Sequence, residues 1–445
     1  MQYITIFDYL LLPVYLYIFY IIVKKRSAKY PDAELRKYYF TAFYLRMFGA
    51  VAYAMMVQYY YGYGDSFVFY YGSDFLSTQV AQDSGNFQYF FKPAEEVKLW
   101  YDAEVGDPNY SGYFGIASNL FIMKVSAVLS LFSFNKYLII TLFFGAFSFA
   151  GIWKLFLVFK DINKDKHVKL LAWGVLYVPS VWFWGSGLMK DSICLGGIGF
   201  IIHYMYSLFI KKEFSIKSII ALIALVYIVG SVKSYIIIVL VIGLSVFAFY
   251  NLISPIKNLV IRSFILLLFF TAIVTVAFIS NIGEQLQELV VESKVQVDAY
   301  QRNYEAVQNE DERSRGNVKS QEIDASLSGL ILHSPIAIFT CLFRPFIWES
   351  RKIFILFSSF ESFLLLLCTL FVIIKLRFLG FFKEIFNNPF VLASFFIAVL
   401  FALVIGFTTY NFGTMARYKI VLLPFYFFTL VHLYTASTDK AKKAV

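Results

Sequence analysis

Residues 389–407 read PFVLASFFIAVLFALVIGF, an apolar stretch that contains no charged residue. A helix needs roughly 20 apolar residues to cross the hydrocarbon layer of a bilayer, so this stretch is long enough to span it. Ten further stretches of this kind follow one another along the chain, at 3–23, 40–60, 137–159, 169–187, 191–210, 216–232, 235–252, 262–281, 353–375 and 418–436. We therefore predict an all-α, polytopic helical membrane protein with about 11 transmembrane helices, because helices satisfy their own backbone hydrogen bonds in lipid.

The composition supports this class. Of the 445 residues, 60% are apolar and 15% are charged, whereas soluble domains have about 25% charged residues. Aromatic residues reach 20%, with 52 Phe and 33 Tyr, and lipid-facing surfaces and interfacial belts accommodate such side chains. A soluble enzyme is excluded, and no Gly/Ser-rich or Pro-rich linker divides the chain, so we expect one integral membrane domain over 1–445.

The charges separate into basic and acidic loops. The net charge is +10, and Lys and Arg gather in short loops at 24–37, 160–169, 211–217, 257–262, 375–383 and 440–443. Acidic residues gather instead in 61–112 and 282–328. Cytoplasmic loops of membrane proteins carry an excess of Lys and Arg, so the basic loops are predicted to be cytoplasmic. The N-terminus is then outside and the C-terminus inside, in the cell inner (plasma) membrane, and a nucleic-acid partner is excluded.

Two further apolar segments are predicted not to cross the membrane. Residues 114–134 carry Lys124 in an apolar stretch, and reading them as a crossing would place the next basic loop on the wrong side. We therefore expect an external surface helix within the external loop 61–134, where a lysine can reach the interface. Residues 330–350 contain Pro335 and Arg344, which predicts a re-entrant or interfacial element within a second external loop, 282–350.

No metal or cofactor signature is present in the sequence. The three cysteines (Cys194, Cys341 and Cys368) show no CxxC spacing, and the four histidines form no HExxH-like pair. We expect inert buried thiols, no metal and no cofactor.

Charged residues beside apolar segments are the candidate functional groups, because ionised groups at membrane depth are costly. In the predicted topology they fall on the external side: Asp65, Lys190, Asp191, Lys233, Arg344, Glu349, Arg351 and Arg417. Cations that converge on an acid could hold a lipid phosphate and activate a hydroxyl. The alternative is structural: Lys190 and Lys233 end hairpins, Lys190 pairs locally with Asp191, and Arg417 anchors its helix at the interface.

Several short motifs resemble GT-C-type glycosyltransferases, polytopic enzymes that use polyprenyl-phosphate-linked sugars. They are Gly64-Asp65 with Tyr70 and Tyr71, Pro179 with Trp182 to Gly187 and Lys190-Asp191, and Arg417-Tyr418 with Pro424. Arg344-Pro345-Phe346 with Trp348-Glu349 resembles a segment of membrane proteins from polysaccharide export clusters.

The resemblance implies a sugar transfer from a polyprenyl-phosphate-linked donor to a glycan acceptor, with inversion at the anomeric carbon. Asp65 would be the base, and Lys190 and Arg417 would hold the phosphate, with Tyr418 beside Arg417. The adjacent acid pair of such enzymes is missing here, and the nearest second acid is Asp74, which is therefore the second candidate for the base.

Three other functions differ from this transfer in the sequence features that they require. A lipid-linked polysaccharide polymerase uses the same substrates, and the sequence does not separate it from a transferase. A membrane transporter or flippase would predict inverted repeats and broken helices, and the sequence indicates neither. An intramembrane serine protease built on Ser186 would need His203 as its base, which lies roughly 18 Å away along a helix and is out of reach.

Overall fold

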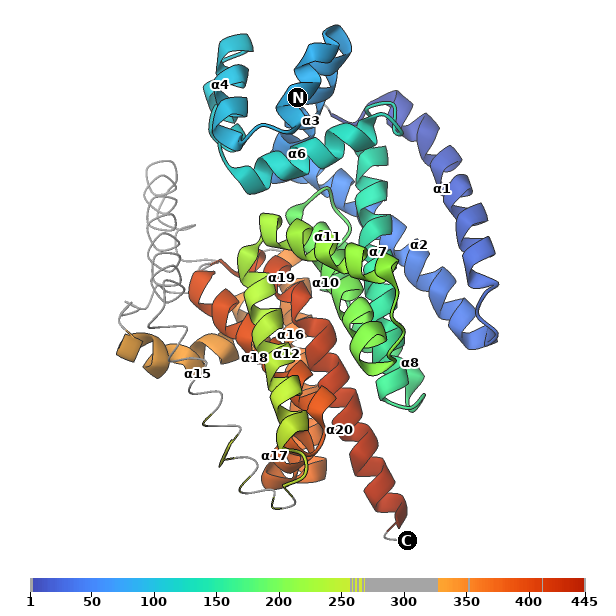
Figure 1. The fold of residues 1–445 in the computed structure, drawn as a ribbon, viewed down its shortest axis with the longest axis vertical. Helices are drawn as coiled ribbons and strands as arrows, with labels where there is room; N and C mark the ends of the chain where they lie inside the picture. The colour runs from blue at the N-terminus through green and yellow to red at the C-terminus, as the bar shows by residue number, and fades with distance from the viewer. Residues whose placement is uncertain are drawn as a thin grey trace. The chain divides into compact units, whose positions relative to one another are not determined.

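The computed structural model describes residues 3–256, 327–350, 353–409 and 411–443, together with positions 258, 261, 264, 265 and 268. Within these residues every regular element is a helix (Figure 1), which confirms the all-α prediction for this part of the chain. The helices form two compact units: unit 1 is Met1–Asp161 with Leu176–Ile237, and unit 2 is Ile162–Val175 with Ile238–Val445.

Seven described helices are long and apolar enough to cross a membrane. They are α1 (Ile6–Ser27), α2 (Ala33–Met56) continued by the π-helical turn η1 (Val57–Tyr61), α7 (Tyr137–Ile162), α10 (Lys190–Met205) continued by η3 (Tyr206–Ile210), α12 (Ser234–Ile253), α16 (Ile353–Leu376) and α18 (Pro389–Thr408). Two bent helix pairs raise the count to nine if each is one span. A membrane-protein architecture is therefore supported, whereas the predicted count of 11 is not confirmed.

The predicted span 169–187 is interrupted. The chain forms α8 (Val168–Leu176) and then the short helix α9 (Pro179–Trp184). Val178 is extended, with φ −59° and ψ 125°, because a residue before proline disfavours the helical conformation and proline has no backbone N–H. The apolar composition of this stretch concealed the break, and the prediction of a continuous helix here was wrong.

Three other predicted spans, 216–232, 262–281 and 418–436, are not among the seven. The last of them falls within the bent pair Phe412–Val421 and Leu423–Asp439. Residues 216–232 form α11 (Ile216–Val232), whose 17 residues measure about 26 Å, slightly less than the hydrocarbon thickness. The predicted span 262–281 and the acidic segment 282–326 lie outside the described residues, apart from positions 264, 265 and 268.

The predicted loop 61–134 consists mainly of helices in unit 1. They are α3 (Asp65–Gln82), the 3-10 helix η2 (Ser84–Phe90), α4 (Ala94–Glu104), α5 (Pro108–Phe114) and α6 (Ala117–Ser130). Helix α3 packs against α6, and Gly72 permits this approach, because a Cβ there would lie 2.4 Å from the Met123 sulfur. Figure 1 shows α6 lying across the end of α7, the orientation expected of a surface helix. The side of the membrane on which it lies stays a prediction.

Glycines bring α7 and α10 into backbone contact in unit 1. A Cβ on Gly151 would lie 1.9 Å from the Gly196 carbonyl oxygen, so only glycine fits. Phe147 contacts Gly196, and Lys154, one turn farther along α7 than Gly151, interacts electrostatically with His203. The two helices therefore run in the same direction, and Lys190 lies near the level at which α7 begins.

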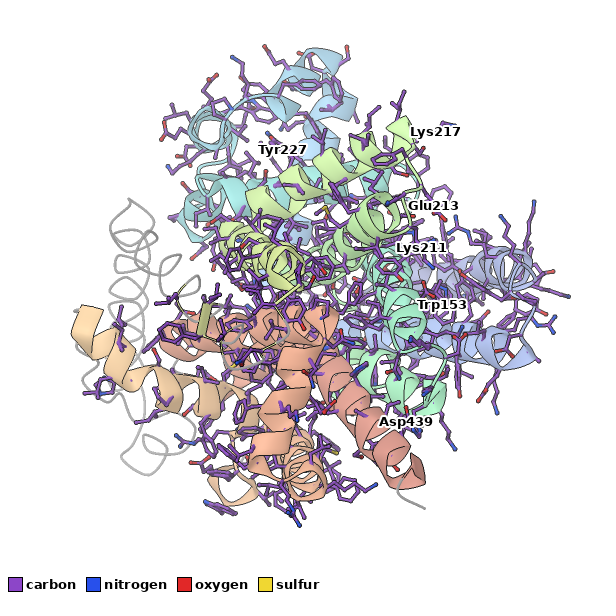
Figure 2. The ribbon with its side chains drawn as sticks, turned by 60° about the horizontal axis from the view of Figure 1, so that its bottom comes forward. Trp153, Lys211, Glu213, Lys217, Tyr227 and Asp439 are labelled. Atoms are coloured by element: carbon purple, nitrogen blue, oxygen red, sulfur yellow. The ribbon has the colours of Figure 1, made fainter. Side chains whose placement is uncertain are left out.

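The loop that joins η3 to α11 is basic and hydrogen-bonded in unit 1. Figure 2 labels Lys211 and Glu213 in this loop and Lys217 in the first turn of α11. The Lys211 ammonium lies 2.5 Å from an Asp161 carboxylate oxygen, and Ser207 Oγ donates to Glu213 at 2.8 Å. These contacts tie the end of η3 to the end of α7.

Unit 2 contains a further set of helices around α18. They are α15 (Leu327–Phe343), the 3-10 turn η5 (Ile347–Glu349), α17 (Phe378–Asn387), α19 (Phe412–Tyr418), the 3-10 turn η6 (Lys419–Val421) and α20 (Leu423–Lys443). Helix α18 packs against both α15 and α20. The predicted interfacial element 330–350 is helical through Phe343, with Pro335 inside α15, and then turns at 344–349.

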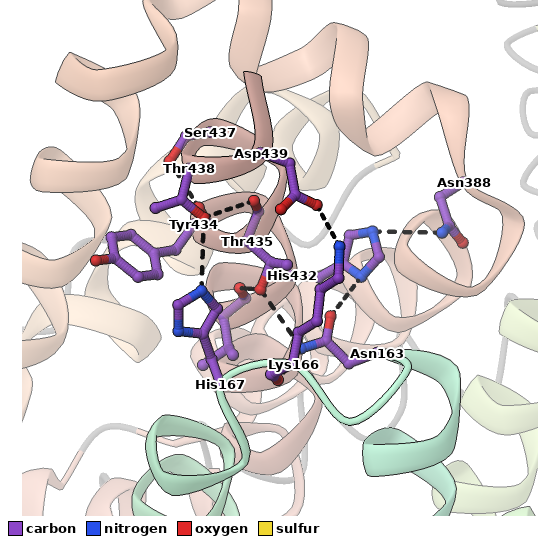
Figure 3. A network of polar contacts seen from close by, with 11 residues as sticks. Asn163, Lys166, His167, Asn388, His432, Tyr434, Thr435, Ser437, Thr438 and Asp439 are labelled. Carbon is purple, nitrogen blue, oxygen red and sulfur yellow. Dashed lines mark hydrogen bonds and ion pairs between the residues drawn. The ribbon is translucent and has the colours of Figure 1, made fainter. Parts of the chain in front are cut away.

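A polar network fixes the loop after α7 to α20 within unit 2 (Figure 3). His432 joins two amides: its Nδ1 is 3.0 Å from Asn163 Oδ1, and its Nε2 is 3.3 Å from Asn388 Nδ2. The Lys166 ammonium lies 2.6 Å from an Asp439 carboxylate oxygen. The segment predicted to be the cytoplasmic loop 160–168 is therefore held by side chains of α20, and Asn388, the N-cap of α18, contacts the His432 ring of this network.

Candidate functional site

The centre of the candidate site is a buried ion pair in unit 1. Asp191 lies in the first turn of α10 and is 2% exposed, and Lys233 follows the last residue of α11 and is 13% exposed. The Lys233 ammonium is 2.6 Å from Asp191 Oδ1. Removing two charges from water costs several kcal/mol for each ion, and only a close pairing offsets this cost. Helix α10 packs against α11, and this contact brings together two residues that the sequence predicts as functional candidates.

Lys190 joins the same cluster from a different direction. Its ammonium donates a hydrogen bond to Ser118 Oγ of α6 at 2.7 Å. The carboxylates of Asp65 and Asp191 both interact electrostatically with it, as does the like charge of Lys233. Lys190 thus donates its hydrogen bond to α6, and Asp191 forms a close ion pair with Lys233 rather than the predicted local pair with Lys190.

Asp65 is the first residue of α3 and is placed by two glycines. Gly62 has φ 71° and Gly64 has φ 142°, values that a residue with a side chain rarely adopts. These glycines let the chain leave η1 and start α3 within three residues. Besides Lys190, the Asp65 carboxylate interacts electrostatically with Tyr113 of α5. Asp65 therefore belongs to the cluster of Lys190, Asp191 and Lys233.

Asp74 has a different position. Asn135 Nδ2 donates a hydrogen bond to Asp74 Oδ1, and Tyr70 Oη donates to the Asn135 carbonyl at 2.9 Å. Asn135 has φ 49° in the turn between α6 and α7. Asp74 and Tyr70 thus both hydrogen-bond to Asn135 and stabilise this turn, and the catalytic role of Asp74 stays a prediction.

Arg344 and Glu349 form a clip at the end of α15 in unit 2. Arg344 donates to both carboxylate oxygens of Glu349, with Nε 3.1 Å from Oε2, and the Phe346 N–H donates to Oε2 at 2.8 Å. The Arg344 guanidinium also lies over the Phe412 ring, 5.3 Å from its centroid. Burial alone would raise the pKa of Glu349, but the hydrogen bonds from Arg344 and Phe346 outweigh it, and the pKa is below its usual value.

Arg417 and Tyr418 end α19 and contact each other. Arg417 Nη2 is 3.3 Å from Tyr418 Oη, and the guanidinium carbon lies 5.1 Å from the centroid of the Tyr418 ring. These contacts fit an interfacial anchor, and a phosphate-binding role of Arg417 stays a prediction. Arg351 lies outside the described residues.

Sequence reasoning missed Lys419, a buried cation that lies in unit 2. Lys419 is fully buried, and its ammonium donates to Ser362 Oγ at 2.6 Å. Ser362 Oγ in turn lies 3.3 Å from the Arg344 carbonyl oxygen, which links Lys419 to the Arg344 clip. Glu361 is also buried and interacts electrostatically with Lys419. The available signal was that Glu361 is the only acid within the apolar stretch 353–375.

A metal site is not found in the described part of the chain. No group of three or more His, Cys, Asp or Glu side chains there could hold a metal ion.

The comparisons with known proteins gave no match. The chain matches no protein-family model, no curated protein and no solved structure. A functional assignment therefore depends on the chemistry of the site itself.

Proposed function

We propose that the protein is a membrane glycosyltransferase that moves a sugar from a polyprenyl-phosphate-linked donor to a glycan acceptor at the external face. The observation that carries this proposal is the cluster in unit 1, where the Asp65 carboxylate interacts with Lys190 beside the Asp191–Lys233 ion pair. The cluster lies where two membrane-length helices begin or end, since Lys190 opens α10 and Asp65 follows the π-helical end of α2.

These groups supply what the reaction needs. Asp65 accepts the proton of the acceptor hydroxyl as that oxygen forms a bond to the anomeric carbon. The bond between this carbon and the phosphate oxygen breaks, and the lipid phosphate leaves with the electron pair. Lys190 neutralises the charge that develops on the leaving phosphate. Asp191 holds Lys233 close by, so a second cation faces the same region. A single displacement of this kind inverts the anomeric centre.

Reconstitution tests the proposal. The purified protein in liposomes is given polyprenyl-phosphate-linked sugars carrying a radiolabel, together with glycan acceptors. We expect label to move from lipid to glycan with the wild-type protein and not with Asp65→Asn. A ladder of products that grows by repeating units would identify the closely related polymerase, whereas no transfer from any donor would refute the proposal.

A lipid-linked glycan flippase is the second candidate, and one observation favours it. The sequence indicated no broken helices, but α8 and α9 interrupt a predicted span, and the pair Phe412–Val421 and Leu423–Asp439 is bent by 62°. Discontinuous helices are common at the substrate sites of transporters. A fluorescent lipid-linked glycan in the same liposomes distinguishes the two functions: its movement across the bilayer without any transfer product would replace the transferase proposal by the flippase.

A further inference from the structure

The feature that carries a further inference is Arg46, a cation buried midway along α2. Its side chain is 1% exposed, and in the helix Ala33–Tyr61 it lies roughly 20 Å from either end. Its guanidinium Nη1 donates to the Val181 carbonyl oxygen at 2.6 Å and reaches Ser148 Oγ of α7 at 3.4 Å. Among the described residues, these partners are neutral and no carboxylate pairs with it. A buried guanidinium with only neutral partners is costly, so a functional reason for it is expected.

The partner of Arg46 is the short helix α9, which leads into a non-helical loop. Residues Gly185–Met189 have no helical backbone, and all five are buried within unit 1. Irregular backbone at this depth is tolerated only where protein surrounds it or it lines a cavity. The Val181 carbonyl that Arg46 binds also accepts the Gly185 N–H at 3.3 Å, so Arg46 acts at the point where the loop begins.

One face of α2, which we call the track, contacts the segment 181–187. Arg46, Gly49 and Tyr53 recur at i, i+3 and i+7, which places them on the same side of the helix. A Cβ on Gly49 would lie 2.5 Å from the Trp182 carbonyl oxygen, and a Cβ on Gly187 would lie 2.5 Å from the Tyr53 ring. The track therefore holds the segment 181–187 at three successive points.

The loop Gly185–Met189 leads directly into two residues of the candidate site. Lys190 and Asp191 follow Met189 directly, and Ser192 Oγ of α10 donates to the Gly187 carbonyl at 2.6 Å. Leu195 of α10 also packs against Gly185. A shift of the 185–189 loop would move Lys190 away from Ser118 and Asp65.

We propose that Arg46 is a positioning residue for the proposed transferase: by binding the Val181 carbonyl it fixes the buried loop Gly185–Met189, and the loop sets the places of Lys190 and Asp191. The proposal rests on the transferase function for its effect on rate, but its effect on the loop is independent of that function. Misplacing reacting groups by about 1 Å costs on the order of 10²-fold in rate.

The test uses Cys194 of α10, which is fully buried, as a reporter. In a Cys341→Ala/Cys368→Ala background, labelling by N-ethylmaleimide follows the packing of α10 and the loop. Arg46→Met removes the charge at similar size, and Arg46→Lys keeps a donor for Val181. Lys154→Met is the matched control, because Lys154 is a cation within the neighbouring membrane-length helix α7, and its electrostatic partners among the described residues are Arg26 and His203 rather than residues of the loop.

We expect Arg46→Met to label Cys194 at least tenfold faster than the control and to slow transfer by on the order of 10²-fold. Arg46→Lys should restore most of the protection and of the rate. Equal labelling in Arg46→Met and Lys154→Met would overturn the proposal, and so would a lack of rescue by Arg46→Lys.

A second pair of variants keeps the proposal testable if Arg46→Met does not fold. A Cβ on Gly185 would lie 2.6 Å from Arg46 Nη1, so Gly185→Ala disturbs the same contact from the other side. We expect Gly185→Ala with Arg46→Lys to label Cys194 no faster than Gly185→Ala alone, since both act on one contact. Fully additive effects would refute the shared contact. If the wild-type protein transfers no sugar, the proposed function fails, while Cys194 labelling still tests Arg46.

Discussion

Removing Lys233 should destabilise the protein strongly, because it leaves a buried carboxylate without its cation. In Lys233→Met the side chain keeps its length, but Asp191, 2% exposed, loses the ammonium at 2.6 Å. Breaking a buried ion pair from one side costs about 3–5 kcal/mol. Each 1.4 kcal/mol changes an equilibrium tenfold, so the folded-to-unfolded ratio should fall about 10²- to 10⁴-fold.

Unfolding in mixed detergent micelles, followed by tryptophan fluorescence, measures this change. Lys92→Met is the matched control, since the Lys92–Glu96 pair is exposed, with side chains 43% and 49% accessible, and exposed pairs contribute little. The double variant Asp191→Asn/Lys233→Met removes both charges and should recover part of the loss. If Lys233→Met unfolds like Lys92→Met, the pair contributes nothing, and the electrostatic description of the cluster is wrong.

Three further predictions concern other parts of the chain. If Arg417 binds phosphate, Arg417→Lys should lower transfer although the charge is kept, because the planar fork that suits a phosphate is lost; unchanged transfer in Arg417→Ala would make this residue an anchor only. Because the pKa of Glu349 is lowered in the folded state, its pairing with Arg344 stabilises the fold above the unfolded pKa, and this stabilisation should be lost as pH falls below about 4.5 through the folded pKa. Glu349→Gln should remove this part of the pH dependence of the unfolding free energy. An unchanged pH profile in that variant would contradict the assignment. A membrane-impermeant maleimide applied from outside should label a cysteine replacing Leu99, which is exposed, and not one replacing Lys164; the opposite pattern would reverse the topology.

The sequence predicts the helices better than their contacts. The length of an apolar stretch is a local property, so α7 and α18 could be recognised from composition alone. The break before Pro179 was also encoded, because proline and the nearby Gly185 are local signals, but the apolar residues around them dominated the interpretation.

In the candidate site, too, the sequence indicates the residues but not their contacts. Asp191 and Lys233 stood out as charges beside apolar segments, but their pairing depends on the packing of α10 against α11, which no local pattern reveals. Arg46 and Lys419 are charges within apolar stretches as well. Their hydrogen-bond partners are a backbone carbonyl and a serine hydroxyl. Such groups occur throughout any chain, so the sequence does not reveal which of them each cation binds.

The role of Asp65 as the base is the central claim, and one comparison tests it most directly. Turnover of labelled sugar is measured for Asp65→Asn and Asp74→Asn, with each rate divided by the amount of folded protein in the liposomes. A general base contributes about 10²- to 10⁴-fold, so Asp65→Asn should lose turnover by that factor. Asp74→Asn makes the same chemical change on the same helix and should affect the turn at Asn135 rather than the rate. Wild-type turnover in Asp65→Asn would contradict the account, because no carboxylate at that position would then take part in the transfer.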